Sequence, residues 1–150
     1  EDPHVVGGER CAIAQVERAE ELSDPVSVKC VVSRSGRLLF CSRDVSRVAS
    51  PQAHTYGPVR TVLGILGYRW DFLERYIGME RTPVEQAESI EQMRILEHDM
   101  TLHGVEFSKG YPGINDLREA QLAEAYLAQD PAQQAVLQEI LEAWPVRSST

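Results

Sequence analysis

Apolar and polar positions along the chain follow two different spacings, and together they predict strands and helices in alternation. Short apolar runs bounded by turn residues predict strands at 11–16, 26–32, 38–41, 62–68 and 101–107. Apolar residues at helical spacing predict helices at 69–77 and 82–98 and, divided at Asp130-Pro131, across 116–144. This order predicts an α/β fold.

Turn residues refine the strand predictions. Gly36 lies in a polar turn between two apolar runs, so residues 26–41 predict a β-hairpin, and the sheet must be mixed rather than wholly parallel. Residues 42–60 have no regular pattern and predict a long loop of the kind that is usually functional or mobile. Gly64 and Gly67 interrupt the next strand, which suggests a close backbone approach there.

Helix starts are marked by capping residues. Thr82 can cap a helix, Pro83 suits its first position, and Glu85 completes a capping box. Asp116 and Glu119 repeat the pattern in the next helix. We predict one domain over residues 1–150, a mixed sheet with flanking helices, and a polar tail at 146–150.

Composition narrows the class of protein. The chain has 150 residues, 43% of them apolar, and a formal net charge of −8. An acidic chain disfavours non-specific nucleic-acid binding, which needs a basic surface. No run reaches the roughly 20 apolar residues of a membrane span, so we expect no membrane partner. The start is polar and lacks Met, which suggests a processed product or a piece of a longer protein.

Cysteine and histidine positions offer little chemistry. Cys11, Cys30 and Cys41 lie in apolar strands without a CxxC pair, and we interpret them as buried structural thiols in a reducing, cytoplasmic compartment. His98 and His103 flank a helix-to-strand break with no acidic residue at ligand spacing, so we predict no metal site from them.

The most informative stretch is 61–117, where strand ends face helix starts, as at many phosphate and carboxylate sites. Residues 63–69 read LGILGYR, 82–85 read TPVE, and 88–98 read ESIEQMRILEH. Together with the hairpin ending at Arg43 and PGINDL at 112–117, they resemble the CMP-Kdo synthetase family across about residues 11–127.

That resemblance implies a nucleotide-diphospho-sugar transferase fold, Rossmann-like in layout, of which this chain is the C-terminal, sugar-acid-binding and dimerisation half. It also implies transfer of CMP from CTP to an eight-carbon sugar acid such as Kdo, with Mg²⁺ and a homodimer. Arg43 would approach a phosphate or carboxylate, and Glu91 and Gln92 would bind sugar hydroxyls. The alternative for all three is a solvated polar role. We assign no catalytic residue.

The chain departs from the family pattern at several places. It contains neither the phosphate loop nor the metal-binding Q-G-D segment, so we expect no turnover from it alone. Val62 and Leu66 replace a His and a Tyr of the sugar pocket. Asn115 replaces the Asp that binds metal, and an amide is a poorer Mg²⁺ ligand than a carboxylate.

Two other hypotheses stay open. The chain could be a degenerate relative that serves as a binding or assembly module, which Val62, Leu66 and Asn115 favour. It could instead belong to a cytidylyltransferase for a less polar acid. Amphipathic stripes within 117–141 fit either core packing or a dimer face.

Overall fold

The computed structural model describes residues 9–49, 56–108, 114 and 117–143. By its internal contacts the chain divides into two compact units, residues 1–110 and residues 111–150. That the two act as one domain stays a prediction.

The first unit is built on a five-stranded sheet in the order β3-β2-β4-β1-β5. The strands are β1 (Glu9–Gln15), β2 (Lys29–Val32), β3 (Leu38–Ser42), β4 (Val59–Gly67) and β5 (Leu102–Phe107). β1 and β5 are parallel, whereas the pairs β1–β4, β2–β3 and β2–β4 are antiparallel. The predicted hairpin and mixed sheet are confirmed.

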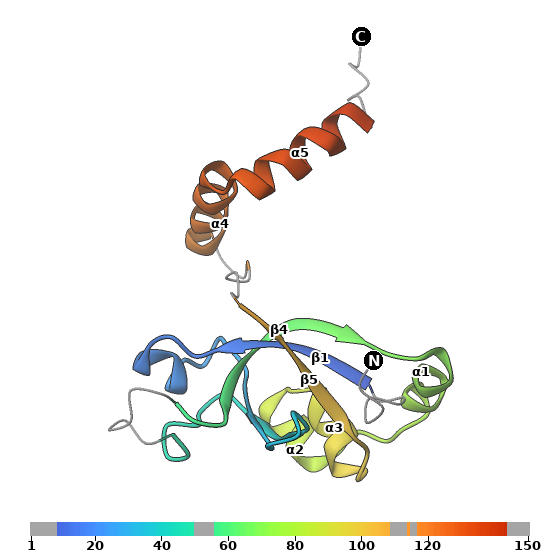
Figure 1. The fold of residues 1–150 in the computed structure, drawn as a ribbon. Coiled ribbons are helices and arrows are strands. Elements are labelled where there is room, and N and C mark those ends of the chain that lie inside the picture. The colour runs from blue at the N-terminus through green and yellow to red at the C-terminus, as the bar shows by residue number, and fades with distance from the viewer. Residues whose placement is uncertain (1–8, 50–55, 109–113, 115–116, 144–150) are drawn as a thin grey trace. The chain divides into compact units, whose positions relative to one another are not determined.

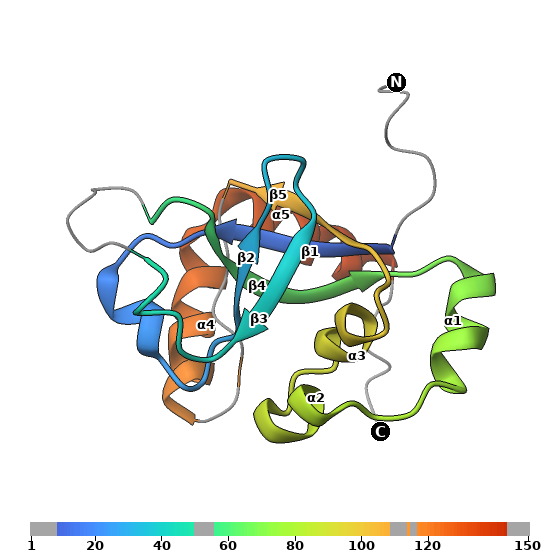
Figure 2. The same ribbon diagram turned by 90° about the horizontal axis from the view of Figure 1, so that it is seen from below.

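Three α-helices and a short 3₁₀ helix complete this unit. They are the 3₁₀ helix η1 (Ala19–Ser23), α1 (Trp70–Ile77), α2 (Pro83–Glu88) and α3 (Gln92–Glu97). Helices α2 and α3 lie side by side against one face of the sheet, and α1 follows the end of β4 (Figures 1 and 2). The capping prediction holds at α2, where the Thr82 N–H donates to the Glu85 carboxylate at 3.3 Å.

The predicted single helix over 82–98 is wrong, because α2 and α3 are separate helices. Ser89 adopts a left-handed backbone with φ of 53°, which ends α2. The Ile90 N–H then donates back to the Glu85 carbonyl at 3.3 Å. This reversal places Ile90 in the core with none of its surface exposed. Burial of that side chain favours the break over a continuous helix.

The expectation of a close backbone approach is wrong at Gly64. A β-carbon there would meet no atom within 4 Å. Instead, φ is +73° at Gly64 and the pairing of β1 with β4 shifts register at this point, so the glycine permits a bulge. β4 also begins at Val59, inside the predicted loop, of which residues 50–55 lie outside the described part.

The main core lies between the helices and the sheet. Strand residues Cys11, Ile13 and Cys41 form one cluster with Ile90 and Ile95 from the helical segment. The three cysteines are free and buried. Burial raises the pKa of Cys11 to about 11 and that of Cys30 to about 12, so both stay protonated and unreactive at neutral pH.

A second, smaller apolar core lies in the same unit. Val45, Val59 and Leu22 belong to this second apolar cluster, formed partly by the segment after β3.

Lys29 on β2 is fully buried, and its Nζ donates to the Asp24 carbonyl at 2.6 Å and the Ser27 carbonyl at 2.8 Å. The ammonium thus ties the loop before β2 to the sheet.

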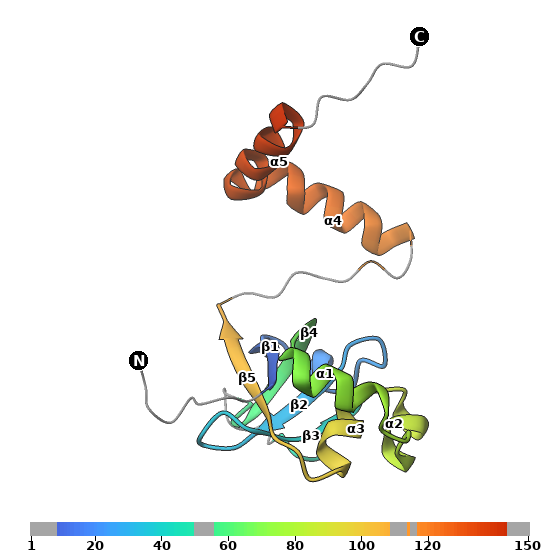
Figure 3. The same cartoon turned by 90° about the vertical axis from the view of Figure 1, so that its right-hand side faces the viewer.

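The second unit has two helices, α4 (Leu117–Gln129) and α5 (Pro131–Ala143), joined at Asp130 (Figure 3). The Asp130 carboxylate accepts the Ala132 N–H at 2.9 Å and so caps α5. The predicted break at Asp130-Pro131 is confirmed.

Eight large apolar side chains on these helices are exposed: Leu117, Leu122, Tyr126, Leu127, Val136, Leu137, Ile140 and Leu141. No helix in the described ranges is both long and apolar enough to cross a membrane.

Candidate functional site

Glu91 and Gln92 lie together where α3 begins. Gln92 has only 4% of its surface exposed, and its side-chain amide makes no hydrogen bond to another described residue. Glu91 is exposed, and no described residue pairs with its carboxylate. The Gln92 amide is not among the described side-chain atoms that are both fully buried and unpaired, so solvent can reach it. The pair therefore offers hydrogen-bonding groups that the protein itself does not use.

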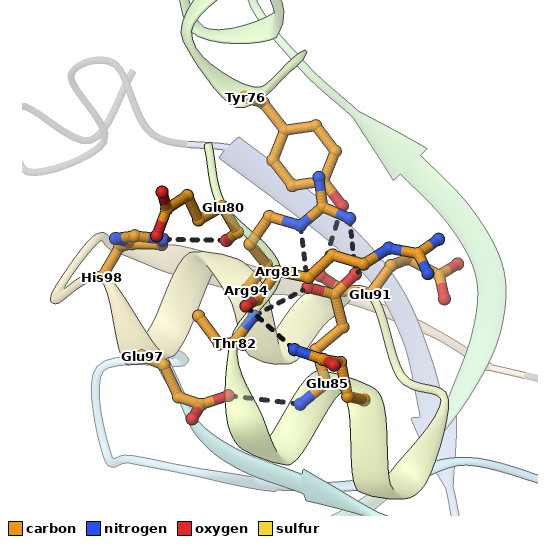
Figure 4. A network of polar contacts seen from close by, with 10 residues as sticks. Tyr76, Glu80, Arg81, Thr82, Glu85, Glu91, Arg94, Glu97 and His98 are labelled. Carbon is orange, nitrogen blue, oxygen red and sulfur yellow. Dashed lines mark hydrogen bonds and ion pairs between the residues drawn. The ribbon is translucent and has the colours of Figure 1, made fainter. Parts of the chain in front are cut away.

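A stack of aromatic rings stands beside this pair. The rings of Tyr68 and Phe72 are 5.5 Å apart between centroids, and those of Tyr68 and Tyr76 are 5.7 Å apart. The Tyr76 hydroxyl donates to the Glu91 carbonyl at 3.3 Å (Figure 4). Burial, then the neighbouring Tyr76, raises the pKa of Tyr68. The stack therefore holds the backbone at the start of α3 through the hydroxyl of Tyr76.

An ion pair supports the stack from below. The Arg94 guanidinium donates twice to the Glu85 carboxylate, with its Nε 2.8 Å from Oε2. It also lies over the Tyr76 ring, 4.6 Å from the centroid (Figure 4). The two charged side chains are only 13% and 7% exposed. The hydrogen bond from Arg94 lowers the pKa of Glu85, so the pair stays charged at neutral pH.

Further contacts fix the ends of α2 and α3. The Glu97 carboxylate on α3 accepts the N–H groups of Val84 and Glu85 at 3.2 Å each, so it caps α2. The His98 ring nitrogen Nε2 lies 3.2 Å from the Glu80 carbonyl oxygen (Figure 4). The segment that carries Glu91 and Gln92 is thus held at both ends.

Arg43, at the end of the hairpin, lies against the turn between α2 and α3. Its guanidinium donates to the carbonyls of Glu88 at 3.1 Å and Ser89 at 3.4 Å. It also donates to the Pro25 carbonyl at 2.9 Å and the Val26 carbonyl at 3.1 Å. These contacts bring Arg43 close to the segment of Glu91 and Gln92, but backbone carbonyls already accept from most of its donors. Ligand binding by Arg43 stays a prediction.

The three altered positions fall in different surroundings. Val62 and Leu66 on β4 are partly buried and pack against the main core cluster. Asn115 lies outside the described residues. Within the described ranges, no three His, Cys, Asp or Glu residues form a group that could hold a metal ion.

The network of Tyr76, Arg94 and Glu85 was not predicted as part of a site. Glu85 was interpreted only as a capping residue, and Tyr76 only as the apolar side of a helix. The one signal for Arg94 is its place in the same segment as Glu91 and Gln92.

Comparison with known proteins places this arrangement in a family. No protein-family model matches the chain. The 3-deoxy-manno-octulosonate cytidylyltransferase of Sodalis glossinidius is 34% identical over 116 residues, 74% of this chain and 46% of that protein. The enzyme of the same name from Acaryochloris marina is 36% identical over 108 residues, 69% of this chain and 42% of that protein.

A solved structure agrees with the sequence relatives. The CMP:2-keto-3-deoxy-manno-octonic acid synthetase complexed with CTP aligns with a TM-score of 0.72 and 26% identity, over 85% of this chain and 51% of that one. The chain belongs to the 3-deoxy-manno-octulosonate cytidylyltransferase family. It spans about half the length of the curated relatives it matches. The five-stranded sheet and its helices are therefore part of that family's nucleotide-diphospho-sugar transferase fold.

Proposed function

We propose that this chain supplies the sugar-acid-binding half of a cytidylyltransferase, which transfers CMP from CTP to Kdo or a related sugar acid. The groups that hold CTP would come from the half of the family fold that this chain does not span. On this proposal the chain alone gives no turnover, works in the cytoplasm, and forms a homodimer through the exposed apolar stripes of α4 and α5.

The amide of Gln92, which makes no hydrogen bond within the described residues, carries the proposal. Its oxygen can accept a hydrogen bond and its nitrogen can donate two, which suits the hydroxyl groups of a sugar. The adjacent Glu91 carboxylate accepts hydrogen bonds only and can orient a further hydroxyl. Together they favour a ligand with neighbouring hydroxyls. A ligand without these hydroxyls would leave the polar groups of Glu91 and Gln92 unpaired and would bind more weakly.

Binding at this place also needs a fixed geometry. Tyr76 holds the Glu91 carbonyl, and Arg94 holds the Tyr76 ring. Side chains locked in this way lose little freedom when a ligand arrives, which strengthens both binding and orientation. The proposed contribution of this half is therefore to position the sugar acid, not to transfer a proton or a phosphoryl group.

Magnesium belongs to the proposal only through the family. The residues that the structure describes do not provide a carboxylate cluster for it. When bound in such an enzyme, Mg²⁺ would neutralise phosphate charge.

Replacing Gln92 tests the sugar-acid site. We expect calorimetry to show that Gln92→Met weakens Kdo binding to the chain about tenfold, because its hydrogen bonds to the sugar are lost while side-chain volume is kept. Gln86→Met is the matched control, since Gln86 is an exposed glutamine on α2. Equal loss in both variants, or unchanged binding in Gln92→Met, would refute the assignment.

Turnover of the chain is measured in parallel with CTP, Mg²⁺ and Kdo by release of pyrophosphate. None is expected from the isolated 150-residue chain. Measurable turnover would show that the catalytic groups are present after all, whereas the binding experiment would still report on Gln92.

A second candidate function is a degenerate binding or assembly module. Val62 and Leu66 favour it, because both pack against the core where the family has polar pocket residues. If the pocket has simply lost these groups, Val62→His with Leu66→Tyr should regain about tenfold in Kdo affinity by calorimetry. No gain would argue against simple degeneration and favour a site for a less polar acid.

A further inference from the structure

Three basic side chains lie in a row across the sheet, away from Glu91 and Gln92. Arg10 on β1 is the direct neighbour of His103 on β5 in the parallel ladder. Arg37, just before β3, forms an isolated antiparallel β-bridge with His103 through the backbone, at the edge of β5 opposite to β1. The Gly104 N–H donates to the Gly36 carbonyl at 2.8 Å and holds the hairpin turn against β5.

The row faces away from the helices. Cys11, Leu38 and Leu102 each adjoin one member of the row and point into the main core cluster under α2 and α3. Successive side chains of a strand point to opposite faces, so Arg10, Arg37 and His103 project from the other face of the sheet. Val105, two residues beyond His103, is 42% exposed on that face.

No acidic partner neutralises this row among the described residues. Neither Arg10 nor Arg37 takes part in any ion pair of the described chain. The ring nitrogen Nδ1 of His103 is buried without a hydrogen-bond partner. Burial, then Arg10 and then Arg37, lowers the pKa of His103. An acidic chain of net charge −8 has thus gathered cations at one place without a counter-charge.

We propose that Arg10, His103 and Arg37 form a binding site for a small phosphate-type dianion. Guanidinium groups present planar pairs of donors that match phosphate oxygens, and two of them flank one imidazole here. A bound dianion would relieve the repulsion within the row and favour the protonated ring, which the row by itself disfavours. The site lies on the opposite face of the sheet from Gln92 and is independent of sugar-acid binding.

Nuclear magnetic resonance of the histidine ring tests this site. The His103 signals of the chain, assigned with a His103→Gln variant, are followed against pH with inorganic phosphate or with sodium chloride of equal ionic strength. We expect phosphate, but not chloride, to raise the pKa of His103. Arg37→Gln should weaken phosphate binding about tenfold through loss of a charge-assisted hydrogen bond.

Arg34→Gln is the matched control, because Arg34 is an exposed arginine of the same hairpin turn. It should leave phosphate binding unchanged, and Arg10→Gln should repeat the effect of Arg37→Gln from a different strand. The proposal is overturned if phosphate and chloride act alike on His103, or if Arg34→Gln weakens binding as much as Arg37→Gln does.

Discussion

Replacing Arg94 with methionine is expected to lower the free energy of unfolding by about 3 kcal/mol, because it leaves the Glu85 carboxylate charged and largely buried. The Glu85 side chain is 7% exposed and receives two hydrogen bonds from Arg94. Methionine keeps most of the aliphatic volume, so the loss reports on the charge and its hydrogen bonds. Urea denaturation at pH 7 measures it.

A double-mutant cycle separates the pair from its surroundings. Glu85→Gln combined with Arg94→Met removes both charges, and we expect it to recover part of the loss of Arg94→Met. Arg81→Met is the control, since Arg81 is 74% exposed and lies 3.9 Å from Glu85. It should cost less than about 1 kcal/mol. Equal losses at positions 81 and 94 would contradict the role of burial.

The same pair sets a dependence on acid. The hydrogen bond that the Glu85 carboxylate accepts from Arg94 lowers the pKa of Glu85 below the ordinary value of 4.5. The resulting stability is present above that value and is lost as the pH falls through the lowered pKa of the folded protein. Arg94→Met should lose less stability than the parent chain over this acid range.

Loss of Arg94 should also weaken ligand binding at the proposed sugar-acid site. The guanidinium supports the Tyr76 ring, and the Tyr76 hydroxyl holds the backbone of Glu91. We therefore expect weaker Kdo binding in the folded Arg94→Met variant, as a consequence of the proposed function.

Replacing Lys29 with alanine is expected to lower the free energy of unfolding by about 3 kcal/mol, through a cavity and two carbonyls left without donors. Lys29 is fully buried, and its Nζ serves the carbonyls of Asp24 and Ser27. Lys29→Met keeps the stem and removes the donors alone, so it should cost about 1–2 kcal/mol. Thermal and urea denaturation at pH 7 compare the two. Equal losses would mean that the stem contributes nothing.

Alkaline pH distinguishes the charge of Lys29 from its packing. Burial, only partly offset by Asp24 and Asp44, lowers the pKa of Lys29 below 10.5. Between the lowered pKa and 10.5 the unfolded chain binds more protons, so the contribution of Lys29 to stability rises with pH in that window. Lys29→Met should lack this rise, and an identical pH profile for both proteins would contradict it.

Local patterns predicted most of the fold. The hairpin around Gly36, the sheet and the break at Asp130-Pro131 follow from apolar runs and turn residues, whose effects act over a few positions. The division at Ser89 was missed because nothing in the local sequence disfavours a helix there as proline would. The tertiary burial of Ile90 decides it, and a single-sequence pattern does not contain that information.

Because the division of the helix at Ser89 was not predicted, the ion pair of Glu85 and Arg94 was not predicted either. Glu85 and Arg94 are nine residues apart, which places them on opposite faces of a continuous α-helix. The left-handed residue folds α3 back beside α2 and brings them together. Glu91 and Gln92 were predicted from family resemblance, whereas the low exposure of Gln92 depends on how the helices pack against the sheet.

The end of β4 that extends beyond its pairing with β2 has a consequence for the handling of the isolated chain. β2 pairs with β4 only as far as Thr61, so among the described strands the rest of that edge, residues 63–67, has no partner. Ile65 within it is 66% exposed. An unpaired apolar edge is a template for added strands. It gives a longer polypeptide a place to extend the sheet, and it gives concentrated samples of the chain a route to ordered aggregates.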